Sequence, residues 1–281
     1  MSPMDLNQEY EIESRVPNVE AVQARYADMS AAAAALPDVQ LGLAYGAEPR
    51  QALDVFAVAA DDAAPALMFF HGGYWRAGSK ETRRFPAAAW RARGVAWVPV
   101  GYRLAPDVTM DDIVADARAA LAWFHANAAR LGSDPERIHV AGNSAGGHLT
   151  GMLAADGWQG AMGLPGDVVK TACAVSGVFD LAPLRQTFAN DWLSLDAEAA
   201  ARNSPMGAPP RAGLAMLLSW GGLESDAFKA QSNDYAARCR AAGAAVSAFE
   251  REEADHFSII GEFGQPESPL FAALAEQLGV A

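Results

Sequence analysis

Residues 137–147 read RIHVAGNSAGG, and they are the strongest indication of the fold in the sequence. A short apolar run ends at Gly142-Asn143-Ser144-Ala145-Gly146, and a helical pattern follows. In a strand-to-helix turn this tight, the central residue is strained and the residues two positions away must lack bulk. The pattern predicts that the Ser144 hydroxyl stands clear at a helix N-terminus, where the helix dipole favours an oxyanion. An ordinary glycine turn is the alternative interpretation.

Strands and helices alternate on both sides of this turn. Short apolar runs predict strands at 53–58, 66–70, 95–100, 137–141, 171–176, 215–220 and 245–250. Helical spacing predicts helices at 18–36, 81–93, 111–131, 226–242 and 270–278. This alternation favours an α/β fold, with one mostly parallel sheet covered by helices on both faces.

The whole chain, 1–281, is expected to form one domain. Residues 1–36 form its N-terminal helical segment. Residues 182–211 are rich in proline and alanine and fit no single helix or strand. We expect 182–211 to be a small cap or lid over the carboxyl-terminal edge of the sheet.

Composition narrows the possible partners. The chain has 281 residues, 51% of them hydrophobic, which is enough for a large core. Its 21 basic and 34 acidic side chains give a net charge of −13, which disfavours nucleic acids and anionic membranes. Cys173 and Cys239 are too few for a disulfide framework or a cysteine zinc site. We expect a cytoplasmic protein without a metal or other cofactor, and a homodimer is compatible with the sequence.

A second motif, His71-Gly72-Gly73-Tyr74-Trp75, follows the strand predicted at 66–70. Its glycines let the backbone approach a reacting carbonyl without a side-chain clash. We expect an oxyanion hole formed by the N–H groups of Gly73, Tyr74 and Ala145. His71 itself is expected to be structural, since its place in chain order does not suit a general base.

A serine nucleophile needs a base and an orienting acid. This architecture places them in the chain order serine, acid, histidine. Of five histidines, only His256 follows the last predicted strand, so it is the expected base. Glu224 and Asp226 both follow the strand at 215–220, and Glu224 is favoured because Asp226 looks like a helix-start residue. Asp180 is a third candidate, interpreted as a turn residue.

Aromatic residues near these motifs predict an apolar substrate pocket. Packing in the core is the alternative for each of them. The candidates are Tyr74, Trp75, Tyr102, Phe179, Trp192 and Phe257.

Together, the motifs resemble the α/β-hydrolases, and within them the arylformamidase (kynurenine formamidase) group and hormone-sensitive-lipase-like esterases. Residues 71–75 are similar to that group's H-G-G-x-W loop, and residues 255–260 (DHFSII) are similar to its C-terminal signature, as are Phe228, Gln231 and Ser232. The resemblance implies Ser144 as nucleophile, Glu224 as acid and His256 as base. Glu224 stands where the group usually has aspartate, and Asn143 where it often has histidine.

The expected function is hydrolysis of a small-molecule formamide or ester through an acyl-enzyme, without a metal. A general short-acyl carboxylesterase or amidase is the alternative within the enzymes. A hydrolase-like protein that binds a ligand without catalysis is the alternative from another class.

Overall fold

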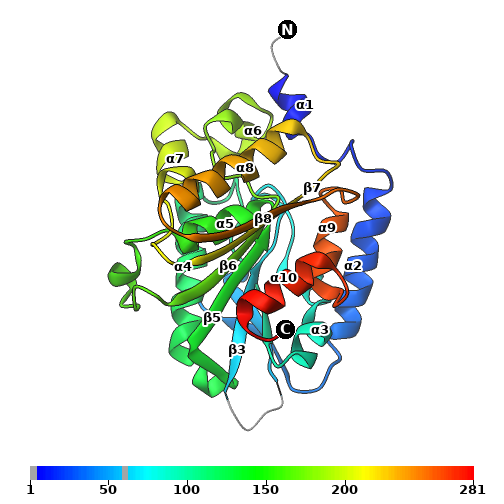
Figure 1. Cartoon of the computed structure of the whole chain (residues 1–281), viewed down its shortest axis with the longest axis vertical. Coiled ribbons are helices and arrows are strands. Elements are labelled where there is room, and N and C mark those ends of the chain that lie inside the picture. Colours follow the sequence, from blue (N-terminus) through cyan, green and yellow to red (C-terminus); the bar gives the residue numbers. More distant parts are fainter. Residues whose placement is uncertain (1–4, 59–62) are drawn as a thin grey trace.

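The computed structural model describes residues 5–58 and 63–281. Its sheet has eight strands in the order β1-β2-β4-β3-β5-β6-β7-β8 (Figure 1). β2 runs antiparallel to both β1 and β4, and every other neighbouring pair is parallel. The mostly parallel sheet predicted from the sequence is therefore confirmed. The strands are β1 (Val39–Ala44), β2 (Ala52–Phe56), β3 (Ala64–Phe70), β4 (Ala96–Val100), β5 (Ser133–Asn143), β6 (Val169–Val175), β7 (Ala215–Gly221) and β8 (Ala245–Arg251).

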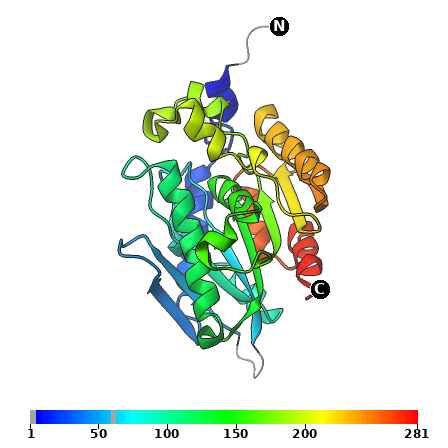
Figure 2. The same ribbon diagram turned by 90° about the vertical axis from the view of Figure 1, so that its left-hand side faces the viewer.

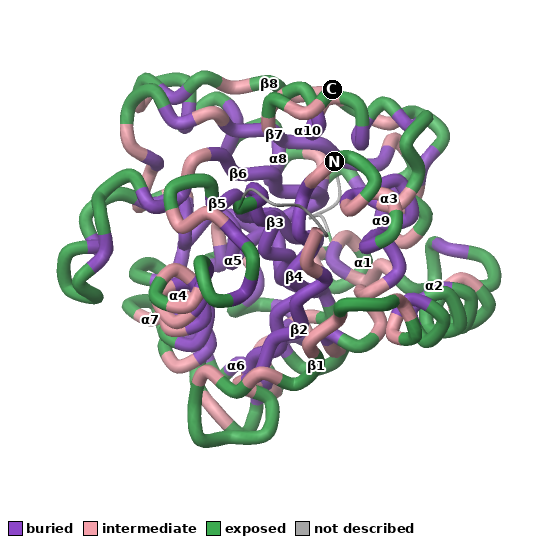
Figure 3. The backbone as a smooth tube through the Cα atoms, turned by 90° about the horizontal axis from the view of Figure 1, so that it is seen from below, coloured by how far each residue is buried: buried purple, intermediate pink, exposed green. Residues whose placement is uncertain are grey.

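Helices cover both faces of the sheet (Figure 2). One face packs against α4 (Met110–Asn127), α5 (Ala145–Ala154) and α8 (Asp226–Ala241). The other face packs against α2 (Val19–Ala33), α3 (Ala87–Ala92), α9 (Ser258–Gly261) and α10 (Pro269–Leu278). Within β3, Met68 and Phe70 enter the first core and Leu67 and Phe69 the second. Because successive side chains of a strand point to opposite faces, an unbroken apolar run suits this doubly covered sheet. Figure 3 shows the buried backbone concentrated in the central strands.

Several elements differ from the sequence prediction. The edge strand β1 and the short helix α1 (Leu6–Tyr10) were not predicted. β5 begins at Ser133, four residues before the predicted start. The helix predicted at 81–93 is instead a 3₁₀ turn, η1 (Lys80–Arg83), followed by α3. Pro86 lies between them and is the N-cap of α3, because proline has no N–H to continue a helix across that point.

Segment 182–211 consists of short helical turns: η4 (Pro183–Gln186), α6 (Asn190–Leu193), α7 (Ala197–Arg202) and η5 (Pro205–Gly207). Helix α1 lies beside it at the same end of the molecule (Figure 1). The Phe188 N–H donates to Asn7 Oδ1 at 2.7 Å. This bond connects the N-terminal segment to segment 182–211, although the two residues are 181 positions apart in the sequence. Within the described ranges, no helix combines the length and apolar character needed to cross a bilayer.

Candidate active site

Ser144 lies in the turn between β5 and α5. Its backbone angles are φ 55° and ψ −120°, a strained conformation for a residue with a side chain. The Ser144 N–H donates to Val175 O at 2.8 Å, which fixes the turn against β6. A Cβ on Gly146 would lie 1.8 Å from Phe70 O, so only glycine fits there. The crowding around this turn leaves Ser144 exposed by 3%, on the wall of a cavity.

The loop after β3 passes directly beside this serine. Gly72 N–H donates to Asn143 Oδ1 at 3.2 Å, and a Cβ on Gly72 would lie 3.0 Å from Ser144 Cβ. Positive φ angles follow at Gly73 (119°) and Tyr74 (50°). In residues 5–58 and 63–281, no hydrogen bond uses the N–H of Gly73 or Tyr74. Both groups are therefore free to donate to a ligand.

A chain of buried hydrogen bonds anchors the end of this loop. Trp75 Nε1 donates to His148 Nδ1 at 3.3 Å, and His148 Nε2 donates to the backbone oxygen of Asn203 at 2.6 Å. This arrangement needs a neutral imidazole, and burial lowers the pKa of His148 to about 4. The loop is thus tied through α5 to the end of α7.

His71 is buried at the start of the same loop. Its ring stacks on Tyr102, and its Nδ1 lies 2.8 Å from Gly72 O. Burial lowers the pKa of His71 to about 3. His139, on β5, bonds to Thr171 Oγ1 at 2.9 Å, and burial lowers its pKa to about 4. These two rings are neutral at neutral pH and serve the packing of the sheet.

Glu224 follows β7 and is 7% exposed. Its Oε1 accepts hydrogen bonds from Ser176 Oγ and from Gly221 N–H, the latter at 3.0 Å. Its Oε2 lies 3.6 Å from His256 Nδ1. Ser176, at the end of β6, was not recognised in the sequence, since an isolated serine after a strand carries no pattern.

His256 is 4% exposed and lies in the loop between β8 and α9. The Asp255 carboxylate accepts the N–H groups of Phe257 and Ser258, both at 2.8 Å, which shapes this loop. The imidazole packs edge-to-face with the ring of Phe228, with ring centroids 4.8 Å apart. His256 also lines the cavity that Ser144 lines. The structure thus brings His256 near both Glu224 and the serine turn.

The other two acids have different surroundings. Asp226 is exposed and is the first residue of α8, whose N-cap is Ser225. Asp180 lies in a turn and accepts the Ala182 N–H at 2.9 Å. In the described part of the chain, no cluster of three or more metal-ligating side chains was found.

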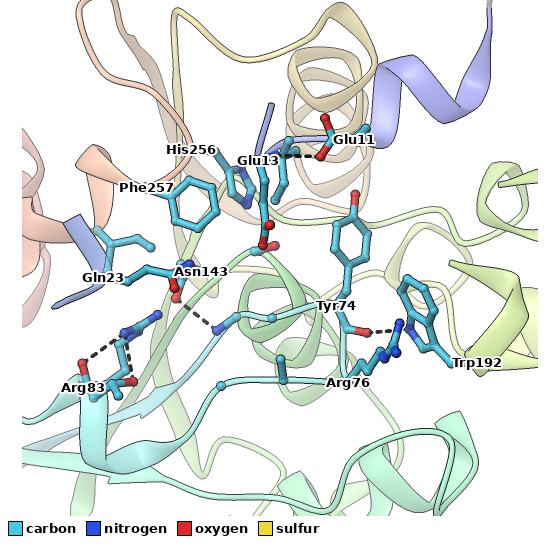
Figure 4. A pocket seen from close by; sticks show the side chains of 18 of the residues that line it. Glu11, Glu13, Gln23, Tyr74, Arg76, Arg83, Asn143, Trp192, His256 and Phe257 are labelled. Atoms are coloured by element: carbon cyan, nitrogen blue, oxygen red, sulfur yellow. Dashed lines mark hydrogen bonds between the residues drawn. The ribbon is translucent and has the colours of Figure 1, made fainter. Parts of the chain in front are cut away.

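The cavity has a volume of about 600 Å³, within the usual range for small-molecule sites. Figure 4 shows Arg83 and Gln23 on one side of it and Arg76 and Trp192 on the other. Of the six aromatic residues expected here, Tyr74, Trp192 and Phe257 line the cavity. Trp75, Tyr102 and Phe179 are fully buried in the core instead.

The N-terminal segment supplies part of the cavity wall, which the sequence did not indicate. Glu11, Ile12 and Glu13 line the cavity. The buried Tyr10 holds them in place, because Gln231 Nε2 donates to its hydroxyl at 2.9 Å and Tyr74 Oη donates to its backbone oxygen. A polar, acidic segment without periodicity gave no signal of this contact.

Comparisons with known proteins place the chain in a family. The BD-FAE family model matches residues 53–211, which include the loop after β3 and the Ser144 turn. Kynurenine formamidase of Danio rerio is 30% identical over 241 residues, covering 84% of this chain and 80% of that protein. The chain belongs to the α/β-hydrolase esterase group. The resemblance stated from the motifs is confirmed.

Other α/β-hydrolase esterases share parts or all of the chain. A carboxylesterase of Mycobacterium tuberculosis is 43% identical over 95 residues, covering 33% of this chain and 30% of that protein. The crystal structure of a Silicibacter protein, described as a candidate thioesterase, superposes with a TM-score of 0.82 at 28% identity, covering 96% of this chain and 98% of that one. These relatives are named for cleaving different acyl bonds. Membership of this group therefore indicates a hydrolase but does not say which type of acyl bond is cleaved.

Proposed function

We propose that the protein is a serine hydrolase of small formamides or esters, with Ser144 as nucleophile, His256 as base and Glu224 as acid. One observation carries the proposal. Ser144 and His256 line the same cavity, and Glu224 Oε2 lies 3.6 Å from His256 Nδ1. That separation exceeds a hydrogen bond, and such contacts tighten when substrate binds.

The mechanism follows from this arrangement. Ser144 Oγ attacks the substrate carbonyl carbon while His256 Nε2 accepts the hydroxyl proton. Glu224 stabilises the imidazolium that forms. The N–H groups of Gly73, Tyr74 and Ala145 receive the oxyanion, Ala145 being the first residue of α5 with an N–H unused within the helix. His256 then protonates the leaving amine or alcohol, and water repeats the sequence to release the acid.

A formamide is the substrate that we favour. The formamidase relative matches over most of this chain, whereas the carboxylesterase matches over a third. The cavity wall is aromatic on the side of the cap segment, where Tyr74 and Phe188 pack with centroids 5.8 Å apart. An aryl leaving group suits such a wall. A short-acyl carboxylesterase is the second candidate, supported by the esterase relatives.

Ser144→Ala tests the mechanism, and a substrate series tests the bond. We expect Ser144→Ala to lose hydrolysis and fluorophosphonate labelling while its thermal unfolding midpoint is retained. Formanilide should be cleaved with a higher kcat/KM, relative to its spontaneous hydrolysis, than phenyl acetate, butyrate or hexanoate. A Ser144→Ala enzyme with the wild-type rate would contradict the mechanism. A preference for the esters would favour the carboxylesterase.

A further inference from the structure

Arg83 is a charged residue of the cavity that the proposed mechanism does not use. It ends η1, and its side chain lines the cavity together with Ser144 and His256. Its Nη1 donates to the backbone oxygen and to Oγ1 of Thr82, both at 3.0 Å. Its Nε is buried without a hydrogen-bond partner. In residues 5–58 and 63–281, no carboxylate lies within 4.0 Å of this guanidinium.

The two other cations of the same turn, Lys80 and Arg84, are both paired with carboxylates. Lys80 Nζ lies 2.7 Å from Asp54 Oδ1, and Arg84 Nε lies 2.8 Å from Asp54 Oδ2. Asp54 is fully buried and pairs with both, and Glu81 Oε1 lies 2.7 Å from Lys80 Nζ and 3.9 Å from Arg84 Nη2. Arg83 has no such partner. Burial lowers the pKa of Arg83 to about 10, so it still carries its charge at neutral pH. Arg83 is half-buried, and a charge shielded from water without a carboxylate partner lowers stability; such groups are concentrated at functional sites.

The other charges of the cavity are engaged or face solvent. Arg76 is exposed, with its guanidinium 4.6 Å from the centre of the Trp192 ring. The Glu11 carboxylate accepts the N–H groups of Glu13 and Ser14. Glu13 is exposed, so water and salt screen its charge. Among the described residues that line the cavity, Arg83 is therefore the half-buried cation that has no carboxylate partner.

We propose that Arg83 binds a carboxylate of the substrate, on a part of the molecule remote from the bond that is cleaved. The inference rests on the proposed serine hydrolysis and adds a substrate class to it, namely formamides or esters that carry a carboxylate. A guanidinium binds a carboxylate through two parallel N–H···O bonds. The carboxylate can lie on the leaving group or on the acyl group, and the substrates below separate these two cases.

The first test uses the wild-type enzyme and therefore does not depend on the folding of a variant. Benzoate and benzamide have the same shape, but only benzoate is charged. We expect benzoate to inhibit phenyl acetate hydrolysis with an inhibition constant about tenfold or more lower than that of benzamide, as for a charge-assisted hydrogen bond. Equal inhibition by the two compounds would overturn the proposal.

The second test uses Arg83→Met, which keeps the length and removes the charge. Two substrate pairs differ in the carboxylate: 4-acetoxybenzoate against 4-methylphenyl acetate for the leaving group, and monophenyl glutarate against phenyl butyrate for the acyl group. We expect kcat/KM to fall by about 10- to 100-fold for the charged member of one pair. The neutral members should change by less than about threefold. The pair that shows the loss locates the carboxylate.

Control variants separate Arg83 from a general charge effect. Arg76→Met changes the other cavity arginine and should alter the charged and neutral substrates alike. Glu13→Gln removes a negative charge that repels the carboxylate of the substrate, and it should raise kcat/KM for the charged substrate by a small factor. Arg83→Met should unfold at the wild-type temperature or above, because replacing a half-buried charge that has no carboxylate partner by an apolar side chain does not destabilise.

Equal losses of kcat/KM for charged and neutral substrates, or a marked fall in the unfolding midpoint, would overturn the role of Arg83. Either result leaves Ser144 labelling intact. Absence of hydrolysis and labelling in the wild-type enzyme would instead refute the proposed function. The two failures are therefore distinguishable.

Discussion

Replacing Glu224 by glutamine turns one oxygen of a buried carboxylate into an amide nitrogen, and the structure decides which one. Oε1 accepts hydrogen bonds from Ser176 Oγ and Gly221 N–H, so the amide oxygen must take that position. The NH₂ group then faces His256 Nδ1 across the 3.6 Å contact. A donor there requires Nδ1 to accept, which places the ring proton on Nε2. An imidazole in that tautomer cannot take the proton of Ser144.

The expected loss follows from this reversed tautomer. The corresponding acid-to-amide change in serine protease triads lowers kcat by about 10⁴-fold. That factor corresponds to about 5 kcal/mol of transition-state stabilisation. Glu224 is not among the residues that line the cavity, so KM should change little. The loss should therefore be confined to kcat.

The assay is hydrolysis of phenyl acetate at about pH 7.5, with fluorophosphonate labelling of Ser144 and thermal unfolding measured on the same samples. Asp226→Asn is the matched control, since Asp226 is exposed and lies two residues further along the chain. It should keep kcat within about twofold of wild type, as a surface substitution does. The reasoning is refuted if Glu224→Gln keeps more than a tenth of kcat, or if Asp226→Asn loses more activity than Glu224→Gln.

Three further outcomes are expected. Ser176→Ala removes one of the two donors to Glu224 Oε1 and should lower kcat by about tenfold without changing KM; unchanged kcat in steady-state assays would show that this bond does not position the acid. Gly146→Ala should give no folded protein, since its Cβ would lie 1.8 Å from Phe70 O, and a cooperative unfolding transition near the wild-type midpoint would contradict this. The buried histidines make stability depend on pH: burial holds the pKa of His139 and His148 at about 4, so the unfolded chain binds protons that the folded chain does not. The free energy of unfolding should thus be highest above about pH 6.5 and fall as pH drops toward 4, by on the order of 3 kcal/mol for each ring. Urea titrations of the wild type and His139→Gln check this, and the variant should show a smaller fall.

The strand, turn and helix around Ser144 could be predicted because sterics alone restrict that sequence. The glycine two positions after the serine faces the backbone of β3, and any side chain there would clash. Chain order similarly singled out His256. The first inference depends on local sterics, and the second depends on an order of catalytic residues that holds across this architecture.

Side-chain direction after a strand could not be predicted in the same way. Tyr74 lines the cavity, whereas Trp75 points into the core, because two successive positive φ angles turn the loop between them. The N-terminal contact was missed for another reason. Tyr10 meets Gln231 across 221 positions of sequence, and no local pattern encodes such a distance. The edge strand β1 has no buried residue, so it lacks a buried apolar run.

The chain of hydrogen bonds that anchors the loop after β3 does not end inside the protein. Asn203, which accepts the bond from His148, also donates through Nδ2 to Asp111 Oδ1 at 2.9 Å. Asp111 in turn pairs with Arg202 at 2.6 Å, and both side chains are about half exposed. Three hydrogen bonds, Asp111–Asn203, Asn203–His148 and His148–Trp75, therefore connect this surface pair to the loop beside Ser144. If the proposed hydrolysis is correct, substitutions at Asp111 or Arg202 are expected to change it from the outer surface, at positions away from the cavity.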